Sequence, residues 1–334
     1  MTERTFGSMA ELEVETGRVI LRPVGSLTVH AAGVVPRHAR EWFVDESRAP
    51  LDVAHWGAGD QAWRGRFPMF DFPDGSAAYF EGAPAGVLDP RQLVAANVEA
   101  VTGAGGHVVN EIVESIDETA NQVVVHLRDG RSITADQVLV ATGSFTNFFE
   151  LLPHAVSTSV ESETIVLATV PDEIGEQLAT APVVSFMIDD PHIADIYMTP
   201  PLVYPDGRWK VKMGANTSTD HFPSSLADAQ RWVHEGPESI GGFGDVAAAM
   251  ISAVTGMWVG VEFTDFEFEP CVITMTENDH PIIDRLSDRT CVAVAGNGSG
   301  AKSSGGWGQL AADLLAGRAW PDWVDTSLLS AHDR

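Results

Sequence analysis

A glycine-rich run near the C-terminus has the most distinctive chemistry of this sequence. Residues 296–303 read Gly-Asn-Gly-Ser-Gly-Ala-Lys-Ser and nearly match the phosphate-binding pattern G-x-x-x-x-G-K-[ST]. However, Ala301 stands where that pattern needs its last glycine, and Gly305 and Gly306 are expected to weaken a helix directly after Lys302. Too little chain follows for a parallel sheet with a magnesium-binding aspartate. The run is therefore not predicted to bind a nucleoside triphosphate.

The same stretch still has the order of a cofactor-binding turn. Residues 292–295 indicate a buried strand, the glycines indicate a tight turn, and a helix is predicted near residues 308–317. Free amides at a helix N-terminus favour an anion or the polar edge of a ring. We therefore predict a cofactor loop, with an ordinary flexible turn as the alternative.

Lysine is rare in this chain, so each lysine is a candidate for chemistry. Of the 20 basic residues only Lys210, Lys212 and Lys302 are lysines. Arginine is a planar, permanently charged fork, whereas lysine is a compact point charge on a flexible stem. A retained lysine can thus indicate a site that needs a point charge. The structural alternatives are a solvated strand face for Lys210 and Lys212 and an exposed loop cation for Lys302.

The two cysteines, Cys271 and Cys291, are too few for a disulfide framework, and no Cys/His spacing indicates zinc. Cys291 lies within an apolar run and is predicted to be a buried core thiol. The residues alone favour the same assignment for Cys271.

The elements that must position these residues alternate between helices and strands. Val138–Val140 form a predicted buried strand that runs into Thr142 and Gly143, and doubly wound sheets bind ligands at such strand ends. Asp129 and Gly130 predict a hairpin turn. The mixture of α/β and antiparallel segments predicts an α/β fold (α+β overall) with two interleaved domains. Helices are predicted at 4–17, 90–104, 225–235 and 244–256, and strands within 107–118, 122–130, 131–140, 164–171, 183–188, 194–198 and 208–214.

Composition and charge limit the function further. The chain has 334 residues, enough for about two domains, and 44% of them are hydrophobic. A net charge of −27 disfavours nucleic acid and anionic membranes as partners. No apolar run reaches the roughly 18 residues of a membrane span, and the acidic N-terminus does not resemble a secretory signal. We expect a cytoplasmic protein.

Residues 269–317, EPCVITMTENDHPIIDRLSDRTCVAVAGNGSGAKSSGGWGQLAADLLAG, resemble the C-terminal signature of a known family. They are similar to the monomeric sarcosine oxidase and N-methyl amino-acid oxidase group of the D-amino-acid-oxidase (DAO) flavoproteins. The run 297–302 overlays the family's glycine-rich loop. The positions in step with the family pattern are Cys271, Thr274, Thr276, His280, Ile282, Ile283 and Asp284.

The resemblance implies FAD as cofactor and a partial Rossmann-like FAD-binding domain interleaved with a mostly antiparallel substrate domain. Residues 1–16 would be a helix of the FAD domain, 17–85 and 151–270 the substrate domain, and 86–150 and 271–334 the rest of the FAD domain. Cys271 would form a thioether to the flavin 8α-methyl group. The other implied cofactor-binding residues are Val113, Thr142, Gly143, Gly296, Asn297, Gly298, Ser299, Gly300, Ala301 and Lys302.

The implied activity is oxidation of the C–N bond of an amine or amino acid to an imine, with O2 reduced to H2O2. Lys212 matches the lysine that promotes electron transfer to O2, and Lys302 matches the lysine that pairs with a substrate carboxylate. Tyr197 or Met198 would take the place of a substrate-facing tyrosine. The implied partners are a small amine or amino acid and O2.

The sequence departs from the family at several positions. Ser299 and Asn216 stand where the family has histidines, and Glu163 stands at an arginine position. The family's opening strand, G-x-G-x-x-G turn and helix have no counterpart here. The alternatives are a truncated or split homologue that needs a partner chain to bind FAD, or a non-catalytic remnant of the fold.

Overall fold

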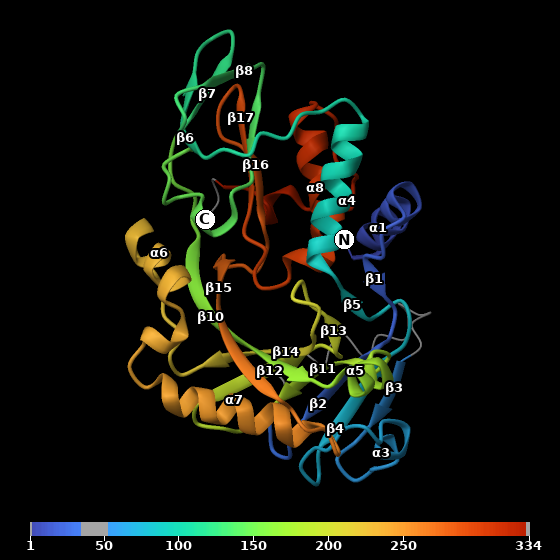
Figure 1. Cartoon of the computed structure of the whole chain (residues 1–334). Coiled ribbons are helices and arrows are strands. Elements are labelled where there is room, and N and C mark those ends of the chain that lie inside the picture. Colours follow the sequence, from blue (N-terminus) through green and yellow to red (C-terminus); the bar gives the residue numbers. More distant parts are fainter. Residues whose placement is uncertain (1, 35–52, 332–334) are drawn as a thin grey trace.

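The computed structural model describes residues 2–34 and 53–331 (Figure 1). Residues 35–52, within the predicted substrate domain, lie outside the described residues. The described chain has an upper part of three helices and small sheets and a lower part built on one large sheet (Figure 1).

The large sheet is almost wholly antiparallel. In the described ranges it has nine strands in the order β15-β10-β14-β12-β11-β2-β4-β3, with β13 beside β14, and of these pairs only β11 and β2 run parallel. Its strands are β2 (Ser26–His30), β3 (Val53–Trp56), β4 (Ala77–Glu81), β10 (Ser159–Val170), β11 (Val183–Met187), β12 (Ile193–Met198), β13 (Leu202–Val203), β14 (Trp209–Thr217) and β15 (Asp265–Met275).

One face of this sheet packs on α7 (Phe243–Met257) and forms the main hydrophobic core. Val211 and Met213 of β14 belong to that core together with Val246 and Met250 of α7. Because successive side chains of a strand point to opposite faces, Lys212 faces the other way, toward the upper part of the molecule. The other helices near this sheet are α3 (Trp63–Arg66), α5 (Asp172–Leu178) and α6 (Leu226–Glu235).

The upper part contains two small sheets. In one, β17 lies between β16, which is antiparallel to it, and β9, which is parallel. The other has the order β6-β7-β8, and Asp129 and Gly130 form its predicted hairpin turn. The bounds are β6 (Val113–Glu118), β7 (Val123–Leu127), β8 (Ser132–Ala135), β9 (Val138–Val140), β16 (Ile282–Arg285) and β17 (Thr290–Val294).

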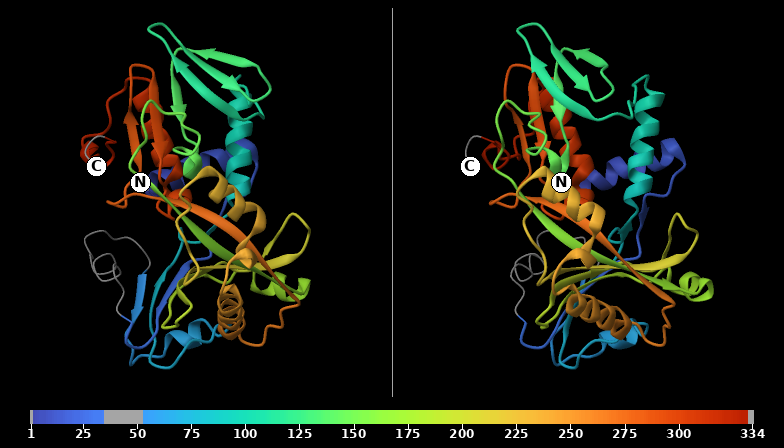
Figure 2. Two further views of the ribbon diagram at one scale, coloured as in Figure 1. Left: turned by 90° about the vertical axis from the view of Figure 1, so that its left-hand side faces the viewer. Right: turned by 60° about the vertical axis from the view of Figure 1, so that its left-hand side comes forward.

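Three helices stand beside these sheets: α1 (Thr2–Thr16), α4 (Pro90–Gly103) and α8 (Gly300–Leu315). Asp89 caps α4 by accepting hydrogen bonds from the amides of Arg91 and Gln92. The short pair β1 (Leu21–Arg22) and β5 (Val87–Leu88) lies where the chain passes between the two parts. The long strands β10 and β15 pair along their whole length and run from the upper part into the lower part (Figure 2).

The start of α8 corrects the sequence prediction. The helix does not begin near Gly308 but at Gly300, and it continues through Gly305 and Gly306. Tertiary packing outweighs the poor helix propensity of glycine, because both glycines face α1. A Cβ on Gly305 would lie 2.9 Å from Ser8 Oγ, and the amide of Gly306 donates to Thr5 Oγ1 at 3.0 Å.

These sheets confirm the predicted α/β class (α+β overall) with segments interleaved along the chain. Strands of the large sheet come from residues 26–81 and 159–275, whereas those of the two small sheets come from 113–140 and 282–294. The residue boundaries between the two domains stay a prediction.

Candidate functional site

The glycine-rich run forms the turn between β17 and α8. Ala295 and Asn297 both have positive φ, of 71° and 48°, a conformation that costs on the order of 1–3 kcal/mol for a non-glycine residue. A Cβ on Gly296 would lie 3.0 Å from the Cα of Gly300, so the turn is closed tightly on itself. This strained turn brings the end of β17 to the start of α8.

Hydrogen bonds fasten the turn to the end of β15. The amide of Asn297 donates to the carbonyl oxygen of Thr274 at 3.0 Å, and Asn297 Oδ1 accepts from the amide of Thr276 at 2.7 Å. Asn297 Nδ2 donates to the carbonyl oxygen of Ala295 at 3.0 Å. A single asparagine side chain therefore sets both the shape of the turn and its position beside β15.

The N-terminus of α8 has no side-chain cap. Ser299 occupies the N-cap position, but its hydroxyl accepts no hydrogen bond from the first turn. The first amides of a helix lack intrahelical partners and carry about half a positive charge between them. This end of α8 can therefore bind a polar or negatively charged group.

A second turn meets the first. Thr142 and Gly143 follow β9, and because β9 and β17 are parallel, the two turns lie at the same edge of the sheet. Ser144 Oγ lies 2.8 Å from Thr274 Oγ1, so this turn is also joined to β15. The structure thus brings both predicted cofactor-binding turns together at the end of β15.

Cys271 lies three residues before Thr274 on the same strand. It is half-buried, and its carbonyl oxygen accepts a hydrogen bond of 2.9 Å from Trp232 Nε1. Burial, and then the carboxyl of Glu163, raise the pKa of the thiol. Cys291, in contrast, is fully buried in β17, as the sequence predicts.

Lys212 and Tyr197 lie on the same face of the large sheet as Cys271. Tyr197 lies across Gly214 so closely that a Cβ there would clash with its ring. Lys212 Nζ is 5.5 Å from the centre of the Tyr197 ring, a cation–π contact. Burial, and then Glu163, raise the pKa of the Tyr197 phenol well above its ordinary value, so the phenol stays protonated.

Other predicted residues lie elsewhere. Met198, the alternative to Tyr197, is on the opposite face, where its Sδ accepts from Trp258 Nε1 at 3.1 Å within the core. Val113 begins β6 and pairs with Leu127 in the β6-β7-β8 sheet. The structure does not bring these two side chains to the Lys212 face.

The other two lysines have acidic neighbours. Lys302 lies in the first turn of α8, where its charge lowers the pKa of the Glu81 carboxyl against the larger effect of burial. Lys210 is only 3% exposed and forms ion pairs with Asp206 at 2.8 Å and Glu267 at 2.9 Å. Lys210 is thus a buried ion-pair residue and not part of the solvated strand face that was its structural alternative.

The sequence did not single out Glu163 as a functional candidate, although this residue stands at a position where the family has arginine. It pairs across the sheet with Cys271, and its pKa is raised to about 7. Burial is the largest cause, followed by the charges of Asp220 and Glu161, whereas Lys212 acts in the opposite direction. A carboxyl group with this pKa can gain and lose a proton near neutral pH.

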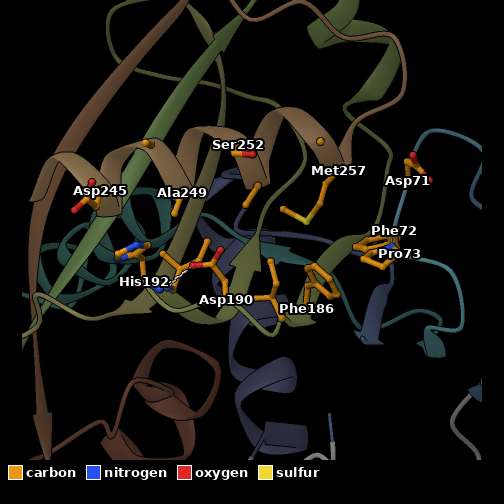
Figure 3. Close-up of a pocket in the computed structure, with 15 residues that line it drawn as sticks. Asp71, Phe72, Pro73, Phe186, Asp190, His192, Asp245, Ala249, Ser252 and Met257 are labelled. Atoms are coloured by element: carbon orange, nitrogen blue, oxygen red, sulfur yellow. Dashed lines mark hydrogen bonds between the residues drawn. The ribbon is translucent and has the colours of Figure 1, made fainter. Parts of the chain in front are cut away.

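A cavity of about 620 Å³ lies on the other side of the large sheet, against α7 (Figure 3). Phe186, Asp190 and His192 line it from the sheet side, and Asp245 and Met257 line it from the helix. None of the predicted site residues lines this cavity. It is therefore separate from the face that carries Lys212 and Cys271.

Comparison with known proteins assigns the family. The sequence profile described as "FAD dependent oxidoreductase" (DAO) matches residues 1–314, so the chain belongs to this family of FAD-dependent oxidoreductases. Among curated proteins, none matches.

Several solved structures have the same fold. Iminodiacetate oxidase from Chelativorans sp. BNC1 is 19% identical with a TM-score of 0.66, and the match covers 99% of this chain and 82% of that one. The amino acid oxidase NikD of nikkomycin biosynthesis is 16% identical with a TM-score of 0.71 over the same shares. Glycine oxidase from Geobacillus kaustophilus is 16% identical with a TM-score of 0.65, covering 100% and 81%.

The residues present fit the ring of a flavin. The uncapped N-terminus of α8 and the hydroxyl of Ser144 offer donors for a polar ring edge, and Cys271 places a thiol near the same strand end. Residues 296–301 follow a strand and open a helix as G-x-G-x-x-A, the looser form of a dinucleotide-binding turn. No described strand follows α8, so a complete βαβ unit is not formed around this turn.

None of the described helices is long and apolar enough to cross a membrane.

Proposed function

We propose that this chain catalyses oxidation of the C–N bond of an amine or N-methyl amino acid, as in the sarcosine-oxidase-like group, with O2 as electron acceptor. Bound FAD would supply the acceptor for the hydride that leaves the substrate carbon. The products would be an imine and H2O2. The observation that carries this proposal is the placement of Lys212, Tyr197 and Cys271 on one sheet face, with Cys271 three residues before Thr274, to which both predicted cofactor-binding turns are joined.

The contacts of Lys212 support a role in the oxygen reaction. Its ammonium group lies beside the Tyr197 ring, and its charge acts on the side chains of Cys271 and Glu163. A fixed cation in a partly dry site stabilises negative charge that develops on O2. Because Lys212 lies on a central strand between β10 and β12, its backbone is held in place from both sides.

The remaining residues would bind the cofactor and the substrate. Val113, Thr142, Gly143 and residues 296–302 would hold FAD, and Cys271 would attach it through a thioether. Tyr197 would orient the substrate by donating a hydrogen bond from its phenol hydroxyl group. Lys302 would pair with a substrate carboxylate. It would do so in competition with Glu81, because the charge of Lys302 already lowers the pKa of the Glu81 carboxyl.

Replacing Lys212 tests the proposal. Lys212→Met is expected to slow reoxidation of the reduced cofactor by roughly 100-fold or more, because the charge near O2 is lost. Reduction by substrate under anaerobic conditions should change much less. Stopped-flow absorbance of FAD measures both rates, and Lys212→Arg, which keeps the charge, is the matched control. Equal oxygen reactivity of the Met variant and the wild type would contradict the oxidase assignment.

A second candidate function is that of a subunit or segment that binds FAD only with a further strand–helix unit. Two observations favour it. The helix α4 exposes Val94, Val98 and Val101 on one face, to 63%, 42% and 49%. The strand β9 pairs with β17 on one edge and with no described strand on the other. A parallel strand on that edge with its helix on α4 would complete the sheet and provide a pyrophosphate-binding turn.

A further inference from the structure

Glu163 has a position that the proposed function does not use. It lies on β10 directly opposite Cys271 of β15, whereas Lys212 of the neighbouring strand β14 is opposite Leu167, four residues further along β10. The strand alternates, so Ser162 and Thr164 are buried toward the other side while Glu163 faces the site. No hydrogen bond or ion pair joins its carboxyl to any other described residue.

The surrounding elements fix the charges that face Glu163. Lys212 comes from β14 and Tyr197 from β12, and Cys271 comes from β15. Asp220 comes from the loop after β14, where it accepts hydrogen bonds from the amide and hydroxyl of Thr217 at 2.6 Å and 2.9 Å. Glu161 precedes Glu163 on its own strand.

That loop is itself fastened to β10. Ser162 Oγ lies 3.0 Å from His221 Nδ1 and accepts from the His221 amide at 2.9 Å. Asp220 is therefore held beside Glu163 by both ends of the loop. This part of the site thus holds three carboxyl groups, and the charge of Lys212 acts on Glu163 alone among them, so the local charge favours a cationic ligand.

Glu163 is the best placed of the described carboxyl groups to accept a proton from a ligand beside Cys271. Glu161 lies two residues further along β10, and both carboxylate oxygens of Asp220 already accept hydrogen bonds from Thr217. The ammonium group of lysine offers only N–H donors. The raised pKa values of Tyr197 and Cys271 keep the phenol and the thiol protonated. His30 is also buried, but it lies four strands from β10, about 19 Å at the usual spacing between strands.

This inference rests on the proposed function, because an amine oxidase can use a group that accepts a proton from its substrate. Alkyl amines reach the enzyme mainly as ammonium ions near neutral pH. Hydride can leave the adjacent carbon only when the nitrogen has a free lone pair to form the C=N bond. The ammonium proton must therefore leave first, and a carboxylate in the site can take it up.

We propose that the carboxylate of Glu163 receives the ammonium group of the substrate and accepts one proton from it. In this step an N–H bond breaks, its electron pair stays on nitrogen, and an O–H bond forms on the Glu163 carboxyl. No electron passes to or from the substrate, so the step needs no oxidant. The substrate would accordingly be a primary or secondary amine that binds in its cationic form.

Proton counting during ligand binding tests this role without turnover. The full chain is equilibrated with excess FAD and titrated with 2-aminoisobutyrate, an amine that has no hydrogen on the carbon beside nitrogen and so cannot be oxidised to an imine. Isothermal calorimetry in phosphate and in Tris gives the number of protons released. Below pH 7 Glu163 is already protonated, so binding should release about one proton; above pH 7 it should release none.

Two variants distinguish proton uptake by Glu163 itself from a general effect of the negative charge around it. Glu163→Gln is expected to remove the pH-dependent step and to weaken binding at pH 8 by about 10-fold to 100-fold. Glu161→Gln, two residues along the same strand, should keep the step but move it to lower pH, because one repelling charge on Glu163 is lost.

An unchanged step in Glu163→Gln, or a wild-type chain that does not bind the probe, would overturn the role of Glu163. Such a result leaves the proposed function to its own test, since flavin reduction by an amine and its reoxidation are measured separately. Conversely, a proton step that follows Glu163 in a protein without oxidase activity would retain the ammonium site and discard the oxidase assignment.

Discussion

At the scale of single residues, the site depends on which face of a strand each side chain occupies. Cys271 and Cys291 show the difference: the first is half-buried on the face that carries Lys212, and the second is fully enclosed in β17. Only the first can therefore approach a ligand at the junction of the two turns.

Intact mass spectrometry of the denatured protein, loaded with FAD, tests the thioether predicted for Cys271. The wild type is expected to carry a flavin adduct, because the thiol lies near the strand end that meets both turns. Cys271→Ser should lose the adduct entirely, and the matched variant Cys291→Ser should keep it. An active enzyme that releases all its flavin on denaturation would contradict covalent attachment.

The sequence predicted Lys212, Cys271 and the glycine turn as parts of the site, which stay predictions, and it left Tyr197 and Met198 as alternatives. The reason is a register shift in β12 between Ala194 and Tyr197, with Asp195 at a φ of 47°. Such a bulge moves all later side chains to the opposite face, so alternation counted from the start of the strand fails. The role of Glu163 depends on its partners across the sheet, which sequence alone does not give.

At the scale of elements, most helices and strands follow from hydrophobic spacing, and the misses have tertiary causes. The sequence placed α4, α6 and α7 within a few residues, but not the true start of α8. The first turns of α8 are stabilised by contact with α1, which lies almost 300 residues earlier in the chain. Local propensity contains no information about such a contact.

Packing of α8 on α1 makes Gly305 a sensitive position. Gly305→Val should lower the free energy of unfolding by about 1–3 kcal/mol, because the added side chain overlaps Ser8 and Thr5. Gly308→Ala, on the same helix with open space around it, should be neutral or stabilise by up to about 1 kcal/mol. Thermal and urea unfolding measure both changes. Equal stability of Gly305→Val and the wild type would show that the two helices are not in close contact.

At the scale of the whole molecule, the large sheet packs one face on α7 in the main core and turns the other face toward the upper part of the molecule. The strands β10 and β15 pair with each other and run from the upper part into the lower part (Figure 1). Cys271 lies on this connecting pair, opposite Glu163. The upper part remains open on one side, where the outer valines of α4 face solvent while Leu93 and Ala96 pack toward α1.

The exposed valines of α4 predict self-association of the isolated chain, since a stripe of apolar side chains spaced at i, i+4 and i+7 normally packs against another element. In sedimentation velocity, the average sedimentation coefficient of the wild type should rise with protein concentration despite the net charge of −27. Val94→Glu combined with Val98→Glu should abolish that rise while leaving thermal stability nearly unchanged, because both side chains are already exposed. Val14→Glu, at a valine of α1 that is 88% exposed and outside this stripe, should have no effect. Concentration-independent sedimentation of the wild type would contradict the view that this face of α4 needs a covering strand–helix unit.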